Sequence, residues 1–193
     1  MYYLLGRSSA SHPCRHVDAY SYPSFPGLWW DDGARFTQPI PIPIEISLKP
    51  LEPLASDHGP DLPAIFLGRI PLFREDFIAA LIKGGVDNLE LHEARLTDPD
   101  TGAAYTNYKA VNIIGLVSAA DLGRSTAIIH DNIPLVDVGF DKLVIDEGKA
   151  GGALLFRLAE NNTAVLVHER LRDHLLDEGF TELEFYNLDE VAL

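Results

Sequence analysis

The sequence has only one cysteine, Cys14, among its 193 residues. A single cysteine cannot form an internal disulfide bond, which excludes the small secreted proteins that a disulfide framework holds together. Cys14 lies between His12 and His16, a spacing that would suit a thiolate nucleophile or part of a metal site. No further ligand or helper group lies nearby in the sequence. We therefore expect no catalytic cysteine, no metal and no cofactor.

Basic residues are also scarce. Lysine and arginine number 15 against 29 aspartates and glutamates, which gives a formal net charge of −14. Proteins that bind nucleic acid or an anionic membrane need clustered lysine and arginine, so neither is the expected partner. The long-range field of an acidic protein instead attracts a basic partner.

Long apolar runs are missing as well. No stretch approaches the roughly 18 apolar residues that a membrane-spanning helix needs. The first residues, Met1 to Gly6, lack a basic region, and their apolar run is too short for a secretory signal. We expect a cytoplasmic protein.

The common catalytic motifs are absent too. The sequence contains no Gly-x-Ser-x-Gly, no Walker loop and no Gly-x-Gly-x-x-Gly. His168-Glu169 resembles the start of a zinc-protease motif, but the next histidine is His174, six residues on instead of four. On a helix this spacing places the two imidazoles roughly 120° apart, so they do not share one metal. We expect no catalytic residues.

Two alternatives stay open beside a protein-binding role. The first is an enzyme of unrecognised type that uses Asp121, His130 or His92. The second is a structural module that forms homo-oligomers through its aromatic and proline-rich amino-terminal part. The oligomeric state itself does not follow from the sequence.

Residues 1–62 differ in composition from the rest of the chain. Nine of the 13 prolines lie between Pro13 and Pro60. Proline disfavours helices, so we expect short strands and ordered loops that pack on a domain formed by residues 63–193, all within one continuous fold. Both tryptophans, Trp29 and Trp30, also lie in this region. We expect one of them in the core; the other is either a second core residue or an aromatic anchor for a partner.

One stretch of the amino-terminal region has a regular pattern. From Pro39 to Leu48 apolar residues alternate with period two, which predicts a strand whose isoleucines all face the core. Three alternating prolines remove the hydrogen-bond donors from one side, so the strand must lie at a sheet edge. A polyproline II segment packed on the core is the alternative.

From about residue 62 onward the pattern is α+β, with a mainly antiparallel or mixed sheet and a few packed helices. Apolar spacing predicts a helix over 73–83, ended by Gly84-Gly85, and a second helix over 168–178, ended by Gly179. A turn is predicted at 98–102. Strands are predicted over residues 86–94, 110–117, 127–130, 142–145, 153–158, 163–167 and 181–186.

The carboxyl-terminal stretch is unusually acidic. From Asp173 to Glu190 there are seven carboxylates and no lysine or arginine. Alternation along residues 181–186 directs Leu183 inward and places Glu182 and Glu184 on the outer face. Such a face either improves solubility or forms a docking surface for a basic protein. We therefore name as candidate partner-binding residues Asp177, Glu178, Glu182, Glu184, Trp29 and Trp30.

Several short segments together resemble a known family. The first is Tyr108 to Gly115, followed by Asp121 and Ser125. The second runs from Leu155 to Glu160 and continues through Val165 to Leu171 and Gly179-Phe180. Shorter matching segments are Trp30 to Gly33, Pro71 to Phe73 and Gly85 to Leu89.

These segments are similar to a bacterial family of immunity proteins from polymorphic toxin systems, long catalogued as a domain of unknown function named after a myxobacterial member. The resemblance implies a non-enzymatic protein that binds a cognate toxin domain and protects the cell that produces it. An acidic face suits a nuclease toxin, because nucleases present basic clefts. Many members have serine just before the last helix, where this chain has His168, so we expect a weaker helix cap.

The polar residues within these segments have structural interpretations. We expect Asn112, Asp121 and Ser125 to be buried groups that hold turns. Arg157 and Glu160 are expected to form a structural ion pair.

Overall fold

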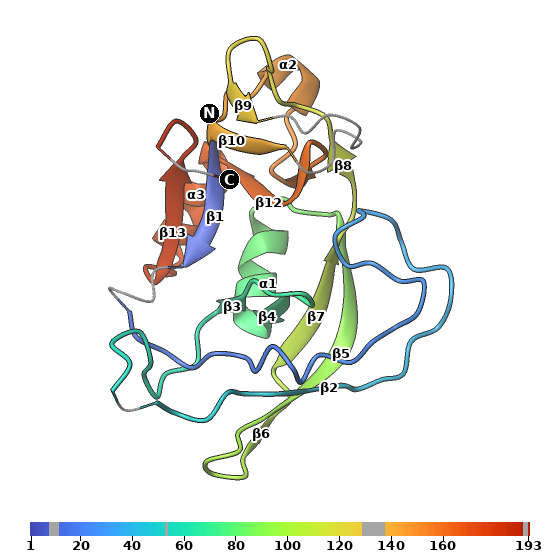
Figure 1. Cartoon of the computed structure of the whole chain (residues 1–193), viewed down its shortest axis with the longest axis vertical. Helices are drawn as coiled ribbons and strands as arrows, with labels where there is room; N and C mark the ends of the chain where they lie inside the picture. The colour runs from blue at the N-terminus through green and yellow to red at the C-terminus, as the bar shows by residue number, and fades with distance from the viewer. Residues whose placement is uncertain (8–11, 53, 129–137, 191–192) are drawn as a thin grey trace.

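The structure is a computed structural model, and it describes residues 1–7, 12–52, 54–128, 138–190 and 193. This part of the chain forms 3 helices and 13 strands. The strands assemble into two larger sheets and one small pair, with the helices packed among them (Figure 1). The predicted α+β class, with mixed and antiparallel sheets, is confirmed.

The first sheet has five strands and joins the two ends of the chain. Its order is β13-β1-β12-β11-β8, and β1 is antiparallel to both of its neighbours. β8 is parallel to β11. The bounds are β1 Tyr2–Arg7, β8 Leu116–Val117, β11 Leu155–Leu158, β12 Asn161–His168 and β13 Leu183–Asn187.

The second sheet has six strands and contains the centre of the sequence. Its order is β2-β5-β7-β4-β3, with β6 paired to β5, and only the β2–β5 pairing is parallel. The bounds are β2 Ile44–Ser47, β3 Ile65–Phe66, β4 Leu72–Arg74, β5 Leu89–Thr97, β6 Ala104–Tyr105 and β7 Tyr108–Ile113. The small pair is formed by β9 Thr126–Ile128 and β10 Gly139–Lys142.

Both predicted helices are present. α1 spans Glu75–Lys83, buries Phe77 and Leu81, and ends where Gly85 takes a φ of +99°, a conformation that glycine adopts without strain. α3 spans Glu169–Asp177 and buries Leu171 and Leu175. A short helix, α2, spans Glu147–Ala150.

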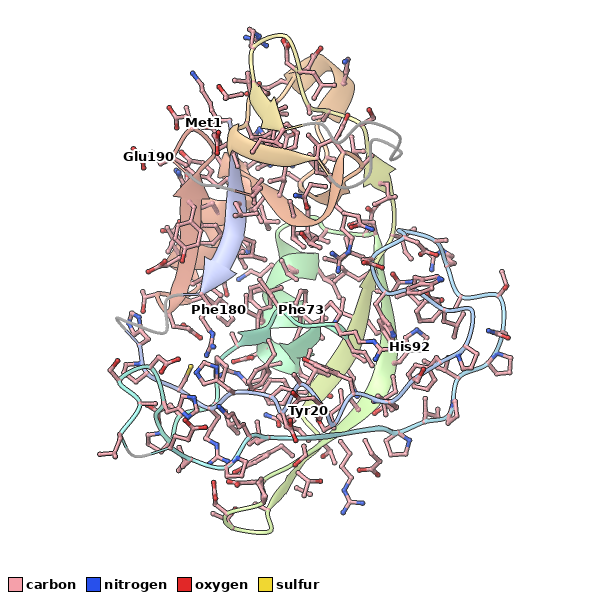
Figure 2. The ribbon with its side chains drawn as sticks, viewed as in Figure 1. Met1, Tyr20, Phe73, His92, Phe180 and Glu190 are labelled. Carbon is pink, nitrogen blue, oxygen red and sulfur yellow. The ribbon has the colours of Figure 1, made fainter. Side chains whose placement is uncertain are left out.

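The main core lies between these helices and the sheets. Phe77 on α1 contacts Phe73 with ring centroids 5.3 Å apart and Phe180 with centroids 5.2 Å apart. Figure 2 shows Phe73 and Phe180 directed into the interior beside α1. This cluster draws on β1, β4, β7, β11, β12 and both longer helices, so it joins the beginning, middle and end of the chain.

The proline-rich stretch becomes a strand only at its end. β2 begins at Ile44, after the third proline, and lies at the edge of its sheet as predicted. Ile44 and Ile46 are buried, but Ile42 is 61% exposed. The prediction that all the isoleucines face the core is therefore wrong, because the regular alternation begins only where β2 pairs with β5.

Several strand boundaries also differ from the prediction. β5 starts three residues after the predicted Val86, because the Asn88 amide donates to the carbonyls of Ile114 and Leu155 and holds the connection after α1. The predicted strand over 110–117 is divided into β7 and β8 by Gly115, which has a φ of +99°. β9 covers the first half of the predicted strand at 127–130. Residues 129 and 130 of that prediction lie outside the described ranges. β10 ends at Lys142, where the predicted strand over 142–145 would begin.

The division of the chain at residue 62 stays a prediction. Two strands from residues 1–62 belong to the large sheets. β1 is an inner strand of the first sheet, and β2 is an edge strand of the second sheet. No helix in the described ranges has the length and apolar character needed to cross a membrane.

Candidate functional site

A cavity of about 360 Å³ opens where the amino-terminal loop meets both large sheets. One wall is the loop that contains Phe25, Trp29 and Trp30. The rest of the lining comes from two other parts of the chain: Leu67, Gly68, Arg69 and Pro71, and Arg157, Thr163 and Val165. We call this cavity the tryptophan pocket.

The two tryptophans have different environments. Trp30 is 5% exposed, and its ring packs edge-on against Phe36 with centroids 4.8 Å apart. Trp29 is 66% exposed although it lines the same pocket. The prediction of one core tryptophan is confirmed, and the other lies at the surface.

The loop that carries the tryptophans is held by a close backbone contact. The Gly115 amide donates to the Gly33 carbonyl at 2.7 Å. Gly33 has a φ of +68°, and a Cβ there would lie 2.8 Å from the backbone of Gly115. A side chain at position 33 would push the loop away from β8. This contact joins the Trp30–Gly33 segment to the segment that ends at Gly115.

Side chains add to this anchor. Asn112 is fully buried, and its amide donates to the Ala34 carbonyl at 2.7 Å and to Glu90 at 2.9 Å. Glu90 also accepts the backbone N–H of Phe36 at 3.1 Å. The second sheet thus fixes the position of the pocket wall through β5 and β7.

Arg157 on β11 is a buried residue that lines the tryptophan pocket. The residue is 5% exposed, and its guanidinium donates from Nη1 to the Asn162 carbonyl at 2.8 Å. Its Nε has no hydrogen-bond partner within the described part of the chain. Burial lowers the pKa of Arg157, and the charge of Asp31, which also lines the pocket, acts in the opposite direction.

The expected Arg157–Glu160 ion pair is wrong. Glu160 is also buried, but it accepts a hydrogen bond from the Ser118 hydroxyl at 2.5 Å. No ion pair between Arg157 and Glu160 occurs among the described side chains. Residues three apart along an extended chain point to opposite sides, so the two groups diverge.

The acidic stretch runs from the end of α3 through the following turn to β13. We call Asp177, Glu178, Glu182 and Glu184 the acidic face. Leu183 is buried between two half-buried glutamates, as the alternation predicted. β13 is an edge strand, and charged side chains at an edge hinder pairing with another chain.

Some of these carboxylates already have partners. Glu178 pairs with Lys83 of α1 at 2.6 Å, and this contact lowers the pKa of Glu178. Glu184 accepts a hydrogen bond from Tyr186, which raises the pKa of Tyr186 to about 12. The acidic face therefore has fewer carboxylates available to a partner than the count of charges implies.

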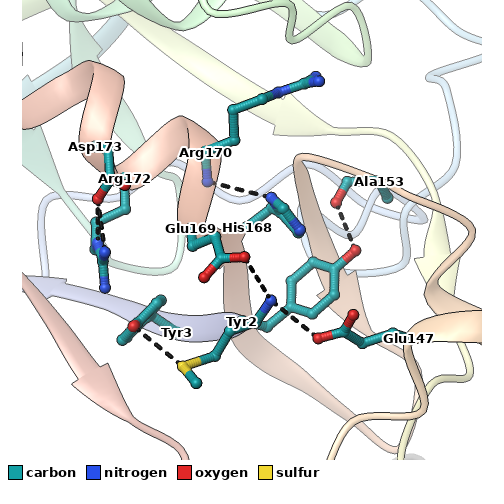
Figure 3. A network of polar contacts seen from close by, with 10 residues as sticks. Tyr2, Tyr3, Glu147, Ala153, His168, Glu169, Arg170, Arg172 and Asp173 are labelled. Atoms are coloured by element: carbon teal, nitrogen blue, oxygen red, sulfur yellow. Dashed lines mark hydrogen bonds and ion pairs between the residues drawn. The ribbon is translucent and has the colours of Figure 1, made fainter.

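A second group of acids is neutralised where β1 meets α3 (Figure 3). The amino group of Met1 contacts Glu147 at 2.9 Å and Glu169 at 3.3 Å. Desolvation opposes the charge of this amino group, but the two carboxylates raise its pKa overall. His168 also caps α3, because its Nδ1 accepts the Arg170 N–H at 3.2 Å. The histidine therefore performs the capping role that we had expected to be weakened.

Two of the remaining family residues, Asp121 and Ser125, hold a turn together. The Asp121 side chain accepts the backbone N–H groups of Gly123 and Arg124 and pairs with the Arg124 side chain at 2.6 Å. The Ser125 hydroxyl accepts the Val144 N–H at 2.9 Å. Both residues are half-buried.

The structure does not bring the candidate catalytic residues together. His92 lies on β5 and stacks on Phe36 with ring centroids 5.4 Å apart, whereas Asp121 lies in a turn that follows β8. His130 lies outside the described residues. Burial lowers the pKa of His92, against a weaker opposite effect of Glu90.

A different group of side chains could present ligand atoms to a metal ion. His16, Asp57 and His58 are half-buried, and one ligand atom of each lies within 4.8 Å of the others. Sequence reasoning had grouped His16 with Cys14 and His12 instead. Cys14 is buried, and its sulfur contacts the guanidinium of Arg7. The signal that was missed is long-range, since His16 and His58 meet through the β-bridge between Cys14 and His58.

Comparison with known proteins identifies one family. A family model described as "Immunity protein family (Imm11)" matches residues 87–190, more than half of the chain. The matched range runs from β5 to β13 and includes Asn112 and Arg157. The amino-terminal wall of the tryptophan pocket lies before it. No curated protein matches the chain.

Proposed function

The chain belongs to the Imm11 immunity protein family, and from this premise we propose that it binds a cognate bacterial toxin domain and neutralises it by direct contact. Family membership is the observation that carries the proposal. We propose a protein that acts in the cytoplasm of the producing cell without catalysis, metal or cofactor. Its partner is a protein, and neither nucleic acid nor a membrane.

The described surfaces support binding in two places. The tryptophan pocket combines an exposed aromatic side chain, Trp29, with a concave surface, and aromatic residues over concave surfaces often dominate binding energy. The acidic face supplies a field that would accelerate the approach of a basic toxin such as a nuclease. We propose that the tryptophan pocket provides most of the binding free energy and that the acidic face raises the association rate.

The experiment is co-expression with the toxin domain encoded beside this gene. Cells that carry the toxin alone should stop growing, and cells that also carry this chain should grow. The two proteins should co-purify at a fixed ratio, whereas a toxin domain from an unrelated system serves as the control. Absence of both rescue and co-purification would refute the proposed function.

Self-association is a second candidate, and one observation favours it. Large apolar side chains of the amino-terminal region are exposed, among them Tyr20 at 98%, Trp29 at 66% and Ile42 at 61% (Figure 2 labels Tyr20). Burial of these side chains against a second copy of the chain would stabilise a dimer through the hydrophobic effect. Light scattering of the purified chain over a range of concentrations tests this, because a monomer throughout would exclude it.

A further inference from the structure

Arg157 gives the tryptophan pocket a buried cation, and no described carboxylate lies within ion-pair distance of it. The guanidinium of Arg157 makes one hydrogen bond, to the Asn162 carbonyl, within the described part of the chain, and its Nε makes none. Leaving a charged group buried and unpaired destabilises a fold, and apolar replacements at such positions are often neutral or stabilising. Arginine at this position is therefore hard to explain by stability alone.

A second donor in the same pocket also has no partner. The indole N–H of Trp30 is buried and makes no hydrogen bond to any described residue. Arg69 adds a third, exposed donor group to the lining. Buried donors without acceptors are rare in folded proteins. The Trp30 N–H has almost no accessible surface, so what the pocket offers to an acceptor is the positive charge of Arg157 and Arg69.

Among the described residues that line the pocket, Asp31 is the one carboxylate. Its charge favours the ionised form of Arg157, but the pair is not within ion-pair distance, 4.0 Å, among the described contacts. Asp31 is half-buried at the surface end of the loop. Its negative charge repels anions that approach the pocket, but it does not form an ion pair with the Arg157 guanidinium.

We propose that the tryptophan pocket receives a single carboxylate side chain, aspartate or glutamate, from the bound toxin. The carboxylate accepts from the Arg157 guanidinium and lies beside the Trp30 ring, while the exposed ring of Trp29 covers its aliphatic part. A charge-assisted hydrogen bond in a desolvated pocket is strong and directional, so this contact selects one toxin among many basic ones. The proposal rests on the proposed function, because it names the feature of the toxin that is recognised.

The first experiment needs no toxin. The probe is a glutamate blocked as N-acetyl, N′-methylamide, and the matched control is the equally blocked glutamine, which lacks only the charge. The indole resonance of Trp30 in a ¹⁵N-labelled chain should shift saturably with the glutamate probe. It should not shift with the glutamine probe, nor with either probe in the Arg157→Met variant.

The second experiment uses the toxin domain and a set of variants. Arg157→Met keeps the length and apolar stem of the side chain, and we expect it to weaken toxin binding at least about tenfold without lowering the melting temperature. Asp31→Asn should tighten binding, since it removes a competing carboxylate. Arg95→Met, on the exposed surface of β5, is the matched control and should leave binding unchanged.

The outcomes separate the two proposals. If the wild-type chain binds the toxin and Arg157→Met binds equally well, the carboxylate site is refuted and the proposed function stands. A second pair of results would also refute the carboxylate site. If Asp31→Asn lowers the melting temperature and the glutamate probe does not shift the Trp30 resonance, the carboxylate of Asp31 is the partner of Arg157. If the wild-type chain does not bind the toxin, the proposed function and the toxin as source of the carboxylate fail together.

Discussion

The tryptophan pocket and the acidic face differ in how many charged groups they hold and in whether those groups are paired. The pocket holds few charges, but one of them is a buried arginine with no counter-ion among the described residues. The acidic face holds many charges, but Glu178 is paired with Lys83 and Glu184 with Tyr186. The number of charges therefore says little about binding. A single unpaired charge in a desolvated place outweighs several solvated ones, because water screens the latter.

The two regions also differ in how they are built. The acidic face comes from neighbouring residues on α3 and β13, so its position follows from the sequence order. The pocket needs a loop near residue 30, a connection near residue 70 and strands beyond residue 155. Predictions that disturb one region and leave the other intact test whether this contrast holds.

The largest expected effect concerns the pocket wall. Trp30→Ala should lower the free energy of unfolding by about 3–5 kcal/mol, because it removes a buried aromatic side chain from the core around Phe36. Trp29→Ala, one residue away on the exposed side, is the control and should change it by less than about 0.5 kcal/mol. Urea unfolding followed by circular dichroism measures both. Equal losses for the two variants would mean that the pocket wall is not divided into a core side and a surface side.

A smaller effect is expected from the acidic face. The double variant Glu182→Lys with Glu184→Lys should slow association with the toxin by about threefold or more at low ionic strength, and less in high salt. The double variant Glu45→Lys with Glu93→Lys makes the same change in net charge on β2 and β5 of the second sheet and serves as the control. Stopped-flow or surface-binding kinetics measures the rates. Equal slowing by both pairs would show that total charge matters and that its position does not.

The smallest effect is a pH dependence beside the pocket. The pKa of His92 is lowered from its usual 6.5 mainly by burial, so the folded chain resists its protonation. Its contribution to stability is complete above about pH 6.5 and is lost as the pH falls below that value. The stability advantage of the wild-type chain over His92→Phe should therefore shrink between about pH 7.5 and about pH 5.5. Unfolding free energies of both chains at several pH values test this; a constant difference would contradict it.

Local patterns in the sequence predicted much of the fold. The helices α1 and α3 follow from apolar spacing and glycine stops, which depend only on neighbouring residues. The exposed and buried sides of β13 follow from simple alternation. The α+β class follows from the sum of such segments.

The pocket could not be predicted in the same way. Nothing near Arg157 in the sequence indicates that it lines the same cavity as Trp30, because residues so far apart in the chain are brought together only by the tertiary fold. The ion pair expected with Glu160 was wrong because proximity in sequence was taken for proximity in space. The exposed Ile42 was missed for a related reason, since alternation describes a strand only where the chain is actually paired.

The position of β1 has a consequence for how the cell makes this protein. Of the described strands, β1 is made before the others, whereas its two neighbours, β12 and β13, are the last two of them to be made. The first sheet can close only after nearly the whole chain has emerged, and pairings so distant in sequence form slowly. A chain still under synthesis therefore lacks the first sheet, and any activity that needs this sheet belongs to finished chains.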